Sequence, residues 1–415
     1  MDNFPLSSAC AFAHHLRNNF FDATRPARHP EWEALIDAIQ TDQAFDARKI
    51  SSLLRQLDPT VEFPPIVDPA AKGECVTIEN ASERCLALPP QPNHYIFKRF
   101  ALPQKIPSLK LYRLCNVVFS YNIDPLEYYL FDDDGNLFDR LICGAAPFEW
   151  SPMIELEEPI VFADDIFPYY NICHLMFDKF PRVQHLCESA GVRHAFLVNS
   201  GDYVDQLMEA WGVKVSSLRS LGMRGSVRLA EAWFFSNSFG RIPHPGRFGS
   251  PVYATAFQAC RDVFGIGSKS SASLRLFLYR LDGGPRSIVN IDAVKDLLDR
   301  WSIEMVDPSR LTLQEQITLF ASTQLLIGVH GAGLTNMIYM PAGGAILELL
   351  PPLYATASYW GIASTLGIEY HHLVCHDPEL GAVDARNRPH VPKNKSRMVE
   401  VPVSLLESKL SQLLC

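Results

Sequence analysis

A histidine followed by two closely spaced glycines stands between two apolar runs near the end of the chain, in QLLIGVHGAGLTNMIYMPAGGAILELL over residues 324–350. Residues 325–329 are apolar and too few for a helix, which predicts an inner strand of a parallel sheet. Residues 334–339 predict a short helix that ends before Pro341. A helix that begins just after two glycines presents unpaired backbone N–H groups and the positive end of its dipole to an anion. The stretch therefore predicts a phosphate-binding turn made by His330, Gly331, Ala332, Gly333, Leu334, Thr335 and Asn336.

This turn has two other interpretations. Glycines after a strand are ordinary turn residues, so the loop can be purely structural. The pattern G-x-G-x-x-N also lacks the full dinucleotide-binding fingerprint, and it lies near the end of the chain instead of after a first strand. A nicotinamide-dependent oxidoreductase is therefore a minor alternative, which a titration with NADH would exclude.

Two arginines and a glutamate are expected near the same sheet edge. Arg280 follows the apolar strand predicted over residues 274–279, and Arg286 comes next in a Gly-Gly-Pro-Arg loop. A guanidinium pairs with phosphate in a fork geometry, although both side chains can equally be surface charges. Glu348 lies near the end of the strand predicted over residues 345–349, where it accepts hydrogen bonds either from ribose hydroxyls or from solvent.

Further polar residues lie on one predicted helix and in one loop. Within residues 168–187, a period of 3.6 residues per turn places His174, Asp178 and Arg182 on nearly the same helix face. Such a stripe is either a solvated face with an ion pair or part of a site. His244 lies in a stretch rich in proline, glycine and serine, which is typical of an interdomain linker and also of an active-site loop.

Three segments together resemble one enzyme family. The segment GVHGAGLTNMIYMPAGGAILEL at residues 328–349 closely resembles the signature of glycosyltransferase family 61, in which a His-Gly-Ala-Gly-Leu-Thr-Asn run precedes a Pro-x-Gly turn and a strand ending in Glu. Tyr279 and Arg280, with Arg286 and Asn290, match a second family segment. The nine residues from His174 to Arg182 match a family helix of the type H-W-L-x-D-x-x-P-R, with Leu175 where an aromatic residue is usual. The resemblance covers about residues 160–375.

The resemblance implies an inverting glycosyltransferase with an α/β, GT-B-like fold, in which two Rossmann-like domains face a central cleft. The donor would be a nucleotide-sugar, with UDP as the nucleotide because characterised relatives tend to use it. The acceptor would be a glycan or glycolipid in polysaccharide biosynthesis. A non-catalytic protein that binds a nucleotide or a sugar on the same scaffold is the alternative.

The resemblance also assigns roles to residues. The general base would be Asp178 or His174, which takes the proton of the acceptor hydroxyl. Arg182 and His244 would lie on the acceptor side, and Glu348 would contact the ribose or base of the donor. The donor diphosphate would contact Arg280, Arg286, His330, Gly331, Ala332, Gly333, Leu334, Thr335 and Asn336.

The sequence predicts no metal or other cofactor. Asp132 and Asp134 have the spacing with which another class of glycosyltransferase binds a metal, but Asp-Asp-Gly-Asn is also a usual composition for a hairpin turn. The glutamate that a calcium-binding loop needs is absent at its required distance. Loss of activity in EDTA would support the metal-dependent alternative.

Composition bounds the class of protein. The chain has 415 residues, 47% of them apolar and 20% charged, which is typical of a globular protein with room for two domains. A net charge of −9 without a basic block argues against a nucleic-acid partner. The sequence has no secretory leader or transmembrane stretch, so we expect a cytoplasmic protein, with peripheral attachment to an inner membrane as a variant. It gives no prediction of oligomeric state.

Strands and helices alternate regularly after residue 252, which predicts parallel βαβ units. We expect an N-terminal acceptor-side domain over residues 1–235, with a helical start and then mixed α/β structure. Residues 236–251 are expected to form a linker or cleft loop, and residues 252–398 the nucleotide-sugar-binding domain. Residues 399–415 contain a last helix that is a candidate to return and pack on the first domain.

Overall fold

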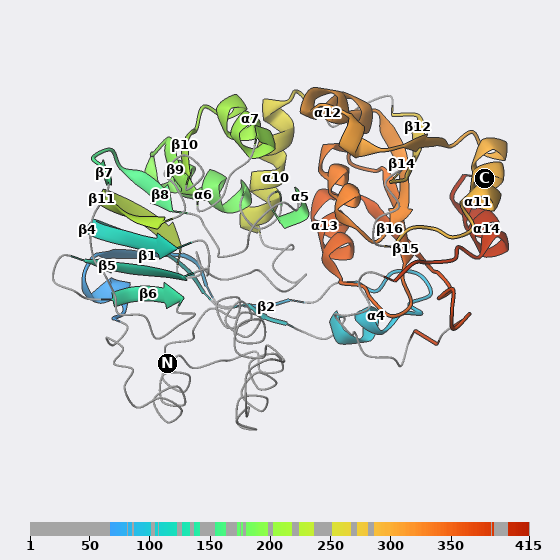
Figure 1. Ribbon diagram of the computed structural model, residues 1–415, viewed down its shortest axis with the longest axis horizontal. Coiled ribbons are helices and arrows are strands. Elements are labelled where there is room, and N and C mark those ends of the chain that lie inside the picture. The colour runs from blue at the N-terminus through green and yellow to red at the C-terminus, as the bar shows by residue number, and fades with distance from the viewer. Residues whose placement is uncertain are drawn as a thin grey trace, which may run out of the picture. The chain divides into compact units, whose positions relative to one another are not determined.

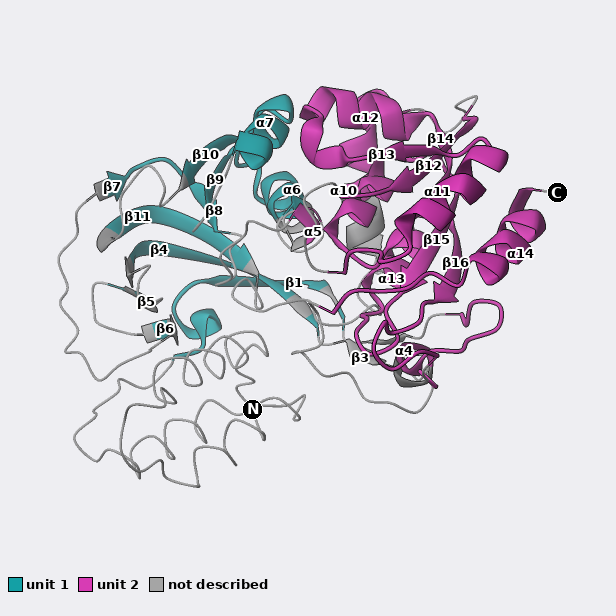
Figure 2. Cartoon of the chain, turned by 45° about the vertical axis from the view of Figure 1, so that its right-hand side comes forward, with its two compact units in different colours: residues 1–81, 107–170, 177–243 teal, residues 82–106, 171–176, 244–415 magenta. Residues whose placement is uncertain are grey.

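The chain folds into two α/β units whose segments alternate along the sequence, as a computed structural model shows (Figure 1). The first unit comprises residues 1–81, 107–170 and 177–243, and the second comprises residues 82–106, 171–176 and 244–415 (Figure 2). The structure describes residues 67–80, 82–84, 87–100, 104–106, 108–122, 127–132, 137–141, 154–162, 172–174, 176, 180–197, 202–217, 224–235, 251–266, 272–280, 286–382, 384–385 and 397–414.

Two segments of the expected N-terminal domain belong to the second unit. Residues 82–106 and 171–176 cluster with the C-terminal part of the chain, although both lie within the range 1–235. The expected linker over residues 236–251 lies outside the described residues, except for Pro251.

The described strands of the first unit form one mixed sheet with the order β10-β9-β8-β11-β4-β5-β6, to which β1 adds beside β4 and β7 beside β11. The strands are β1 (Glu74–Glu79), β4 (Leu109–Asn122), β5 (Glu127–Asp132), β6 (Leu137–Leu141), β7 (Ile154–Leu156), β8 (Ile160–Phe162), β9 (His194–Leu197), β10 (Lys214–Ser217) and β11 (Arg224–Phe235). Pairing is antiparallel among β1, β4, β5, β6 and β11, and parallel among β11, β8, β9 and β10. A Rossmann-like sheet is parallel, so only the β8–β10 part fits that expectation.

Helices α6 (Phe180–Ala190) and α7 (Asp202–Ala210) connect the parallel strands of this sheet. Helix α6 packs on β8, β9 and β11 and buries Val183 and Leu186. Helix α7 ends just before Gly212, which takes a φ of 68°, a left-handed conformation that glycine adopts without cost.

The second unit contains a parallel sheet in the order β13-β12-β14-β15-β16. Its strands are β12 (Leu274–Leu278), β13 (Glu304–Val306), β14 (Thr323–Val329), β15 (Ala345–Leu350) and β16 (Glu369–Val374). The helices of residues 251–414 that accompany this sheet are α10 (Pro251–Val263), α11 (Ile291–Arg300), the 3₁₀ helix η3 (Pro308–Arg310), α12 (Leu313–Ala321), the 3₁₀ helix η4 (Ala332–Tyr339), α13 (Ser358–Leu366) and α14 (Val403–Leu414). These bounds confirm the predicted βαβ succession.

The order of these strands reverses between β12 and β14. After β12 the chain moves to β13 on one side, and it then returns past β12 to β14, β15 and β16 on the other side. Adjacent connections therefore leave β12 and β14 in opposite directions, which opens a crevice at the carboxyl ends of these two strands. In open parallel sheets this is the usual place for a ligand.

Both faces of the central strand β14 are buried, as its unbroken apolar run predicts. Leu326 and Ile327 point to opposite faces, and neither has measurable exposure. Ile327 lies in a core with α11 and α14, whereas η4, α10, α12 and α13 pack against one another elsewhere in the unit. Burial of one such side chain contributes roughly 1.5–3 kcal/mol, so these strands hold the carboxyl ends in fixed positions.

The C-terminal helix corrects one expectation. Helix α14 packs on α11 and β16 of the second unit, and its Leu406 and Leu410 are fully buried in the core of that unit. It therefore belongs to the second unit and not to the first, because its apolar stripe completes one face of the parallel sheet.

Residues 87–97 pack on the second unit as a docked segment that leads into α4 (Tyr95–Phe100). The Tyr95 hydroxyl donates to the carbonyl of Ala355 at 2.9 Å, and the Trp360 indole donates to the carbonyl of Ala87 at 3.0 Å. The ring of Phe97 lies 4.4 Å from that of His372. The segment therefore holds residues 351–360, which follow β15.

Candidate functional site

The glycine turn follows β14 directly. The backbone N–H of His330 donates to the carbonyl of Leu349 at 2.9 Å, which extends the pairing of β14 with β15 by one residue. Helix η4 begins at Ala332, and its first hydrogen bond runs from the N–H of Leu334 to the carbonyl of Gly331 at 3.1 Å. The N–H groups of residues 331–333 therefore precede the helical hydrogen bonds.

The helix after the turn is a 3₁₀ helix over all eight residues, which differs from an ordinary α-helix. Its residues from Leu334 to Tyr339 are all buried, so packing overrides the poorer hydrogen-bond geometry. At its far end the buried Arg261 of α10 donates to the carbonyls of Ile338 at 3.0 Å and Met340 at 2.5 Å. This guanidinium holds the end of η4 in place.

A pocket of about 280 Å³ lies at the carboxyl ends of β12, β13 and β14, where the strand order reverses. All of its lining residues belong to the second unit. They are Ile172, Leu278, Tyr279, Arg280, Arg286, Ser287, Ile288, Asp307, Pro308, Ser309, Gln316, Val329, His330, Gly331, Ala332, Gly333, Leu334 and Asn336. The predicted turn and both predicted arginines thus meet in one pocket, whereas Thr335 is not among its lining residues.

Glycine occupies positions 328 and 331 of this unit for different structural reasons. A Cβ atom at Gly328 would lie 3.1 Å from Cβ of Leu278, which is tighter than an ordinary contact, so the close approach of β12 and β14 favours glycine there. Gly331 has an extended backbone with a φ of 178°, and a Cβ atom there would lie 3.6 Å from Nη2 of Arg286. The Arg286 guanidinium therefore lies beside the glycine turn, in the wall of the same pocket.

Arg286 has an unfavourable backbone conformation. Its φ of 65° is in the left-handed region, which costs a residue with a side chain about 1 kcal/mol or more. Its guanidinium carbon lies 5.6 Å from the centre of the Tyr354 ring, within the range of a cation–π contact. Arg280, by contrast, is an exposed residue at the pocket rim.

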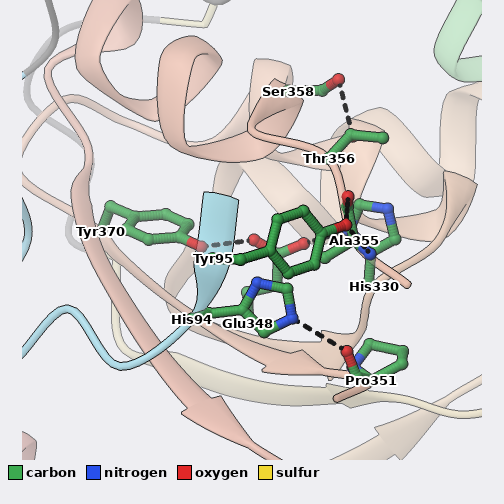
Figure 3. A network of polar contacts seen from close by, with 9 residues as sticks. All are labelled: His94, Tyr95, His330, Glu348, Pro351, Ala355, Thr356, Ser358 and Tyr370. Carbon is green, nitrogen blue, oxygen red and sulfur yellow. Dashed lines mark hydrogen bonds and ion pairs between the residues drawn. The ribbon is translucent and has the colours of Figure 1, made fainter. Parts of the chain in front are cut away.

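His330 and Glu348 form the buried polar centre beside the pocket (Figure 3). Nδ1 of His330 lies 2.5 Å from one carboxylate oxygen of Glu348, and the Tyr370 hydroxyl donates to the other at 2.6 Å. Burial, followed by the nearby Glu348 charge, raises the pKa of Tyr370 well above its usual value, so this hydroxyl keeps its proton. Tyr354 and Tyr359 contact the imidazole with ring centres 5.7 and 5.4 Å away.

The position of Glu348 contradicts one of the two sequence-based interpretations. Its side chain has no measurable exposure, which rules out a solvent-exposed carboxylate. It also does not line the pocket, and two protein groups take its two oxygens, so a ribose contact gains no support from the geometry. Sequence reasoning missed Tyr354, Tyr359 and Tyr370, because tyrosines in an apolar stretch give no signal of their own.

Asn336 carries a buried acceptor without a partner. Its Nδ2 donates to the carbonyl of Gly333 at 3.2 Å, which identifies the other side-chain atom as the oxygen. That Oδ1 atom is buried and has no hydrogen-bond partner among the described residues, and Asn336 lines the pocket. Phosphate oxygens cannot satisfy an acceptor, so this atom suits a hydroxyl or N–H group of a ligand.

The helix with the expected base lies only partly in the described chain. His174 is the last residue of α5 (Ile172–His174), which packs on η4 in the second unit, whereas we expected it on the N-terminal domain. Ile172 of the same helix lines the pocket, so α5 lies next to the pocket as well as next to η4. Arg182 lies in α6 of the first unit. Asp178, His244 and the side chains of His174 and Arg182 lie outside the described residues, so their roles stay predictions.

The predicted acidic turn is described only at its first residue. Asp132 ends β5 of the first unit, and β5 and β6 form the expected hairpin, but Asp134 is outside the described part. Within the described residues, no group of three or more His, Cys, Asp or Glu side chains is arranged to hold a metal ion.

Comparison with known proteins gives the following likenesses. Residues 172–347 match the model of the family described as Glycosyltransferase 61. A xylan glycosyltransferase of Arabidopsis thaliana is 31% identical over 94 residues, which are 21% of this chain and 19% of that protein. An EGF domain-specific O-linked N-acetylglucosamine transferase of Drosophila melanogaster is 34% identical over 67 residues, or 15% of this chain and 13% of that protein. A beta-1,2-xylosyltransferase of Oryza sativa subsp. japonica is 26% identical over 142 residues, or 30% and 26% of the two chains.

The matched range fits the geometry of the second unit. It begins at the pocket-lining Ile172 and ends one residue before Glu348, so it includes the whole glycine turn and every residue that lines the pocket. The chain spans at most 26% of the length of the three relatives named above. Helices with the length and apolar character needed to cross a bilayer are absent from the described part of the chain.

Proposed function

Residues 172–347 belong to glycosyltransferase family 61, and from this premise we propose that the chain transfers a sugar from a nucleotide-sugar to a glycan or glycolipid acceptor. We place the nucleotide diphosphate in the pocket of the second unit. The observation that carries the proposal is the meeting of the glycine turn, Arg286 and His330 in one pocket at the reversal of strand order.

The pocket offers the charge that a diphosphate needs. The N–H groups of residues 331–333 precede the hydrogen bonds of η4 and lie in the pocket wall. Arg286 lies beside the turn at Gly331, and its guanidinium can pair two phosphate oxygens at once. Arg280 at the rim adds a second positive charge. These groups support a reaction that requires no metal, because they stabilise the negative charge that develops on the diphosphate.

The reaction we propose inverts the anomeric configuration. The acceptor hydroxyl gives its proton to a general base, and its oxygen forms a bond to the anomeric carbon. The bond from this carbon to the diphosphate oxygen breaks on the opposite face, and its electron pair leaves with the diphosphate. Asp178 or His174 is the proposed base, and Arg182 and His244 are proposed to contact the acceptor. A GT-B-like arrangement of the two units would bring acceptor and donor together.

The unpartnered oxygen of Asn336 gives this pocket a second kind of recognition. Its neighbours in the pocket bind anions, whereas this oxygen accepts a hydrogen bond. A ribose hydroxyl, a sugar hydroxyl or the N–H group of a base next to the diphosphate would satisfy it. A nucleotide-sugar carries both anionic phosphate oxygens and hydroxyl or N–H donors of a sugar and a base, whereas an inorganic phosphate has no sugar or base.

A panel of nucleotides tests the proposal directly. UDP, GDP and CMP, then UDP-xylose and UDP-N-acetylglucosamine, are added in EDTA, and the rise in melting temperature of the chain is measured. The two sugars come first because the named relatives are xylosyl and N-acetylglucosamine transferases. We expect stabilisation by UDP and one UDP-sugar, followed by release of UDP when an acceptor glycan is added.

Two arginine variants make the test specific to the pocket. Arg286→Ala removes a charge from the pocket wall, and Arg310→Ala removes an equal charge from an exposed side chain just outside it. The proposal requires loss of nucleotide binding in the first variant only. Binding without any transfer to glycan acceptors would instead favour a non-catalytic binding protein, and equal binding by both variants would place the diphosphate elsewhere.

A further inference from the structure

Glu348 is fully buried, next to a pocket that it does not line, and this position needs an explanation. A buried carboxylate is costly unless hydrogen bonds or an opposite charge compensate it. Among the described residues its hydrogen-bond partners are Nδ1 of His330 and the hydroxyl of Tyr370, both at 2.6 Å or less. Of these two, only the imidazole can carry a positive charge.

The hydrogen bonds determine which nitrogen of His330 carries a proton. The Tyr370 hydroxyl keeps its proton, so it donates to Glu348, and a carboxylate can only accept from Nδ1 as well. Nδ1 therefore carries a hydrogen, and Nε2 is the ring nitrogen that can exchange a proton or contact a ligand. Nε2 lies at the opposite edge of a ring that lines the pocket, and it has no hydrogen-bond partner among the described residues.

Aromatic contacts fix the plane of the same ring. Tyr354 and Tyr359 approach the imidazole edge to face, with interplanar angles of 65° and 71°. Burial raises the pKa of Tyr359 well above its usual value, so this group stays neutral beside the imidazole. Among the described residues, the charged and titratable groups around His330 are Glu348, Tyr370, Tyr354 and Tyr359, with Arg286 and Cys173 behind the tyrosines.

We propose that Glu348 is a positioning residue: it holds His330 through Nδ1–H, so that Nε2 takes up a proton when the donor binds and the resulting imidazolium directs Nε2–H at the leaving diphosphate. This proposal rests on the proposed function and deepens it, because it names the groups that neutralise the leaving group. The Nε2–H group donates a hydrogen bond to a phosphate oxygen, and the electron pair of the broken sugar–oxygen bond stays on the diphosphate. The negative charge of Glu348 stabilises the imidazolium while the diphosphate is bound.

Three substitutions separate the parts of this arrangement. Glu348→Gln keeps the shape and the acceptor for Nδ1 but removes the charge. His330→Asn keeps a donor near the Nδ1 position and removes Nε2. Tyr370→Phe removes one hydrogen bond to Glu348 and leaves both other groups intact. Glu369→Gln is the matched control, because it removes an exposed carboxylate outside the pocket lining. Glu369 pairs with His371, and both lie on β16, the strand next to that of Glu348.

The experiment measures UDP binding by isothermal titration calorimetry at one pH in Pipes and in Tris, whose different ionisation enthalpies reveal the number of protons taken up. We expect proton uptake by the wild-type chain. We expect about 10- to 100-fold weaker binding without proton uptake in Glu348→Gln and His330→Asn, as for the loss of a hydrogen bond to a charged group. Glu369→Gln should bind as the wild type does.

The possible outcomes distinguish this inference from the proposed function. If the wild-type chain binds UDP and Glu348→Gln binds it equally well with the same proton uptake, Glu348 is only structural and the inference is overturned. If Glu348→Gln does not fold, His330→Asn decides the matter, because unchanged affinity and proton uptake in that variant would show that Nε2 of His330 does not meet the diphosphate. If the wild-type chain binds no nucleotide at all, the proposed function itself fails.

Discussion

Arg286 combines a strained backbone with a charge in the pocket, and substitution separates the two effects. Arg286→Ala and Arg286→Gly remove the same side chain, so both lose the contact with Tyr354 and the charge beside Gly331. They differ only in the backbone, because alanine at a φ of 65° keeps the strain and glycine relieves it.

The magnitude of this difference follows from two opposing terms. Relief of the left-handed conformation stabilises the glycine variant by about 1–2 kcal/mol. The greater freedom of glycine in the unfolded chain costs about 0.5–1 kcal/mol. The free energy of unfolding of Arg286→Gly should therefore exceed that of Arg286→Ala by roughly 0.5–1 kcal/mol.

Nucleotide binding, unlike stability, should not distinguish the two variants. Both variants lose the charge-assisted hydrogen bonds to phosphate, worth about 1.5–3 kcal/mol, so the UDP dissociation constant should rise about 10- to 100-fold in each. Urea denaturation measures the first quantity and calorimetric titration the second. Arg286→Ala with the higher stability would refute the strain argument, and wild-type affinity in either variant would refute the placement of the diphosphate.

Three further changes test other parts of the account. Gly331→Ala should keep the free energy of unfolding within about 1 kcal/mol of the wild type, because the backbone of Gly331 is extended and the atoms nearest to the added methyl group lie at 3.4 Å or more. The same methyl group enters the pocket beside Arg286 and should weaken UDP binding at least about tenfold in a titration. Unchanged affinity would contradict the pocket assignment. Arg261→Met leaves the carbonyls of Ile338 and Met340 without their donor and should lower the free energy of unfolding in urea by about 2–4 kcal/mol, whereas a neutral result would show that η4 does not depend on this residue. Burial lowers the pKa of His372 from the ordinary 6.5 to about 4. Between these two pH values the unfolded chain therefore binds more protons than the folded chain. The stability that His372 contributes is complete above pH 6.5 and is lost as the pH falls towards 4. At pH 5 the loss should be about 2 kcal/mol relative to pH 7, and His372→Gln, which keeps a donor for Asn93, should show a correspondingly weaker pH dependence of unfolding.

The parallel sheet of the second unit was predictable because its signals are local. Short apolar runs such as residues 325–329 are recognisable without knowledge of their neighbours, and glycine or proline ends each of them. The turn at His330 and the positions of Arg280 and Arg286 follow from the rule that ligands bind where parallel strands end. The pocket lining confirms that these residues meet.

Other features depend on contacts between distant parts of the chain. Tyr370 reaches Glu348 because β15 and β16 are neighbours, and the strand order is not written in the sequence of either strand. The docked segment at residues 87–97 joins the second unit through single contacts, such as Tyr95 with Ala355, which have no periodicity. The 3₁₀ form of η4 depends on burial and on Arg261, a residue of another helix.

The most direct test of the central claim is a crystal structure of the chain with UDP bound. The account predicts that the diphosphate lies within hydrogen-bond distance of the N–H groups of residues 331–333, with the Arg286 guanidinium and Nε2 of His330 as its other partners. The Oδ1 atom of Asn336 should accept from a hydroxyl or N–H group of the nucleotide. A diphosphate bound away from the carboxyl ends of β12 and β14 would contradict the account.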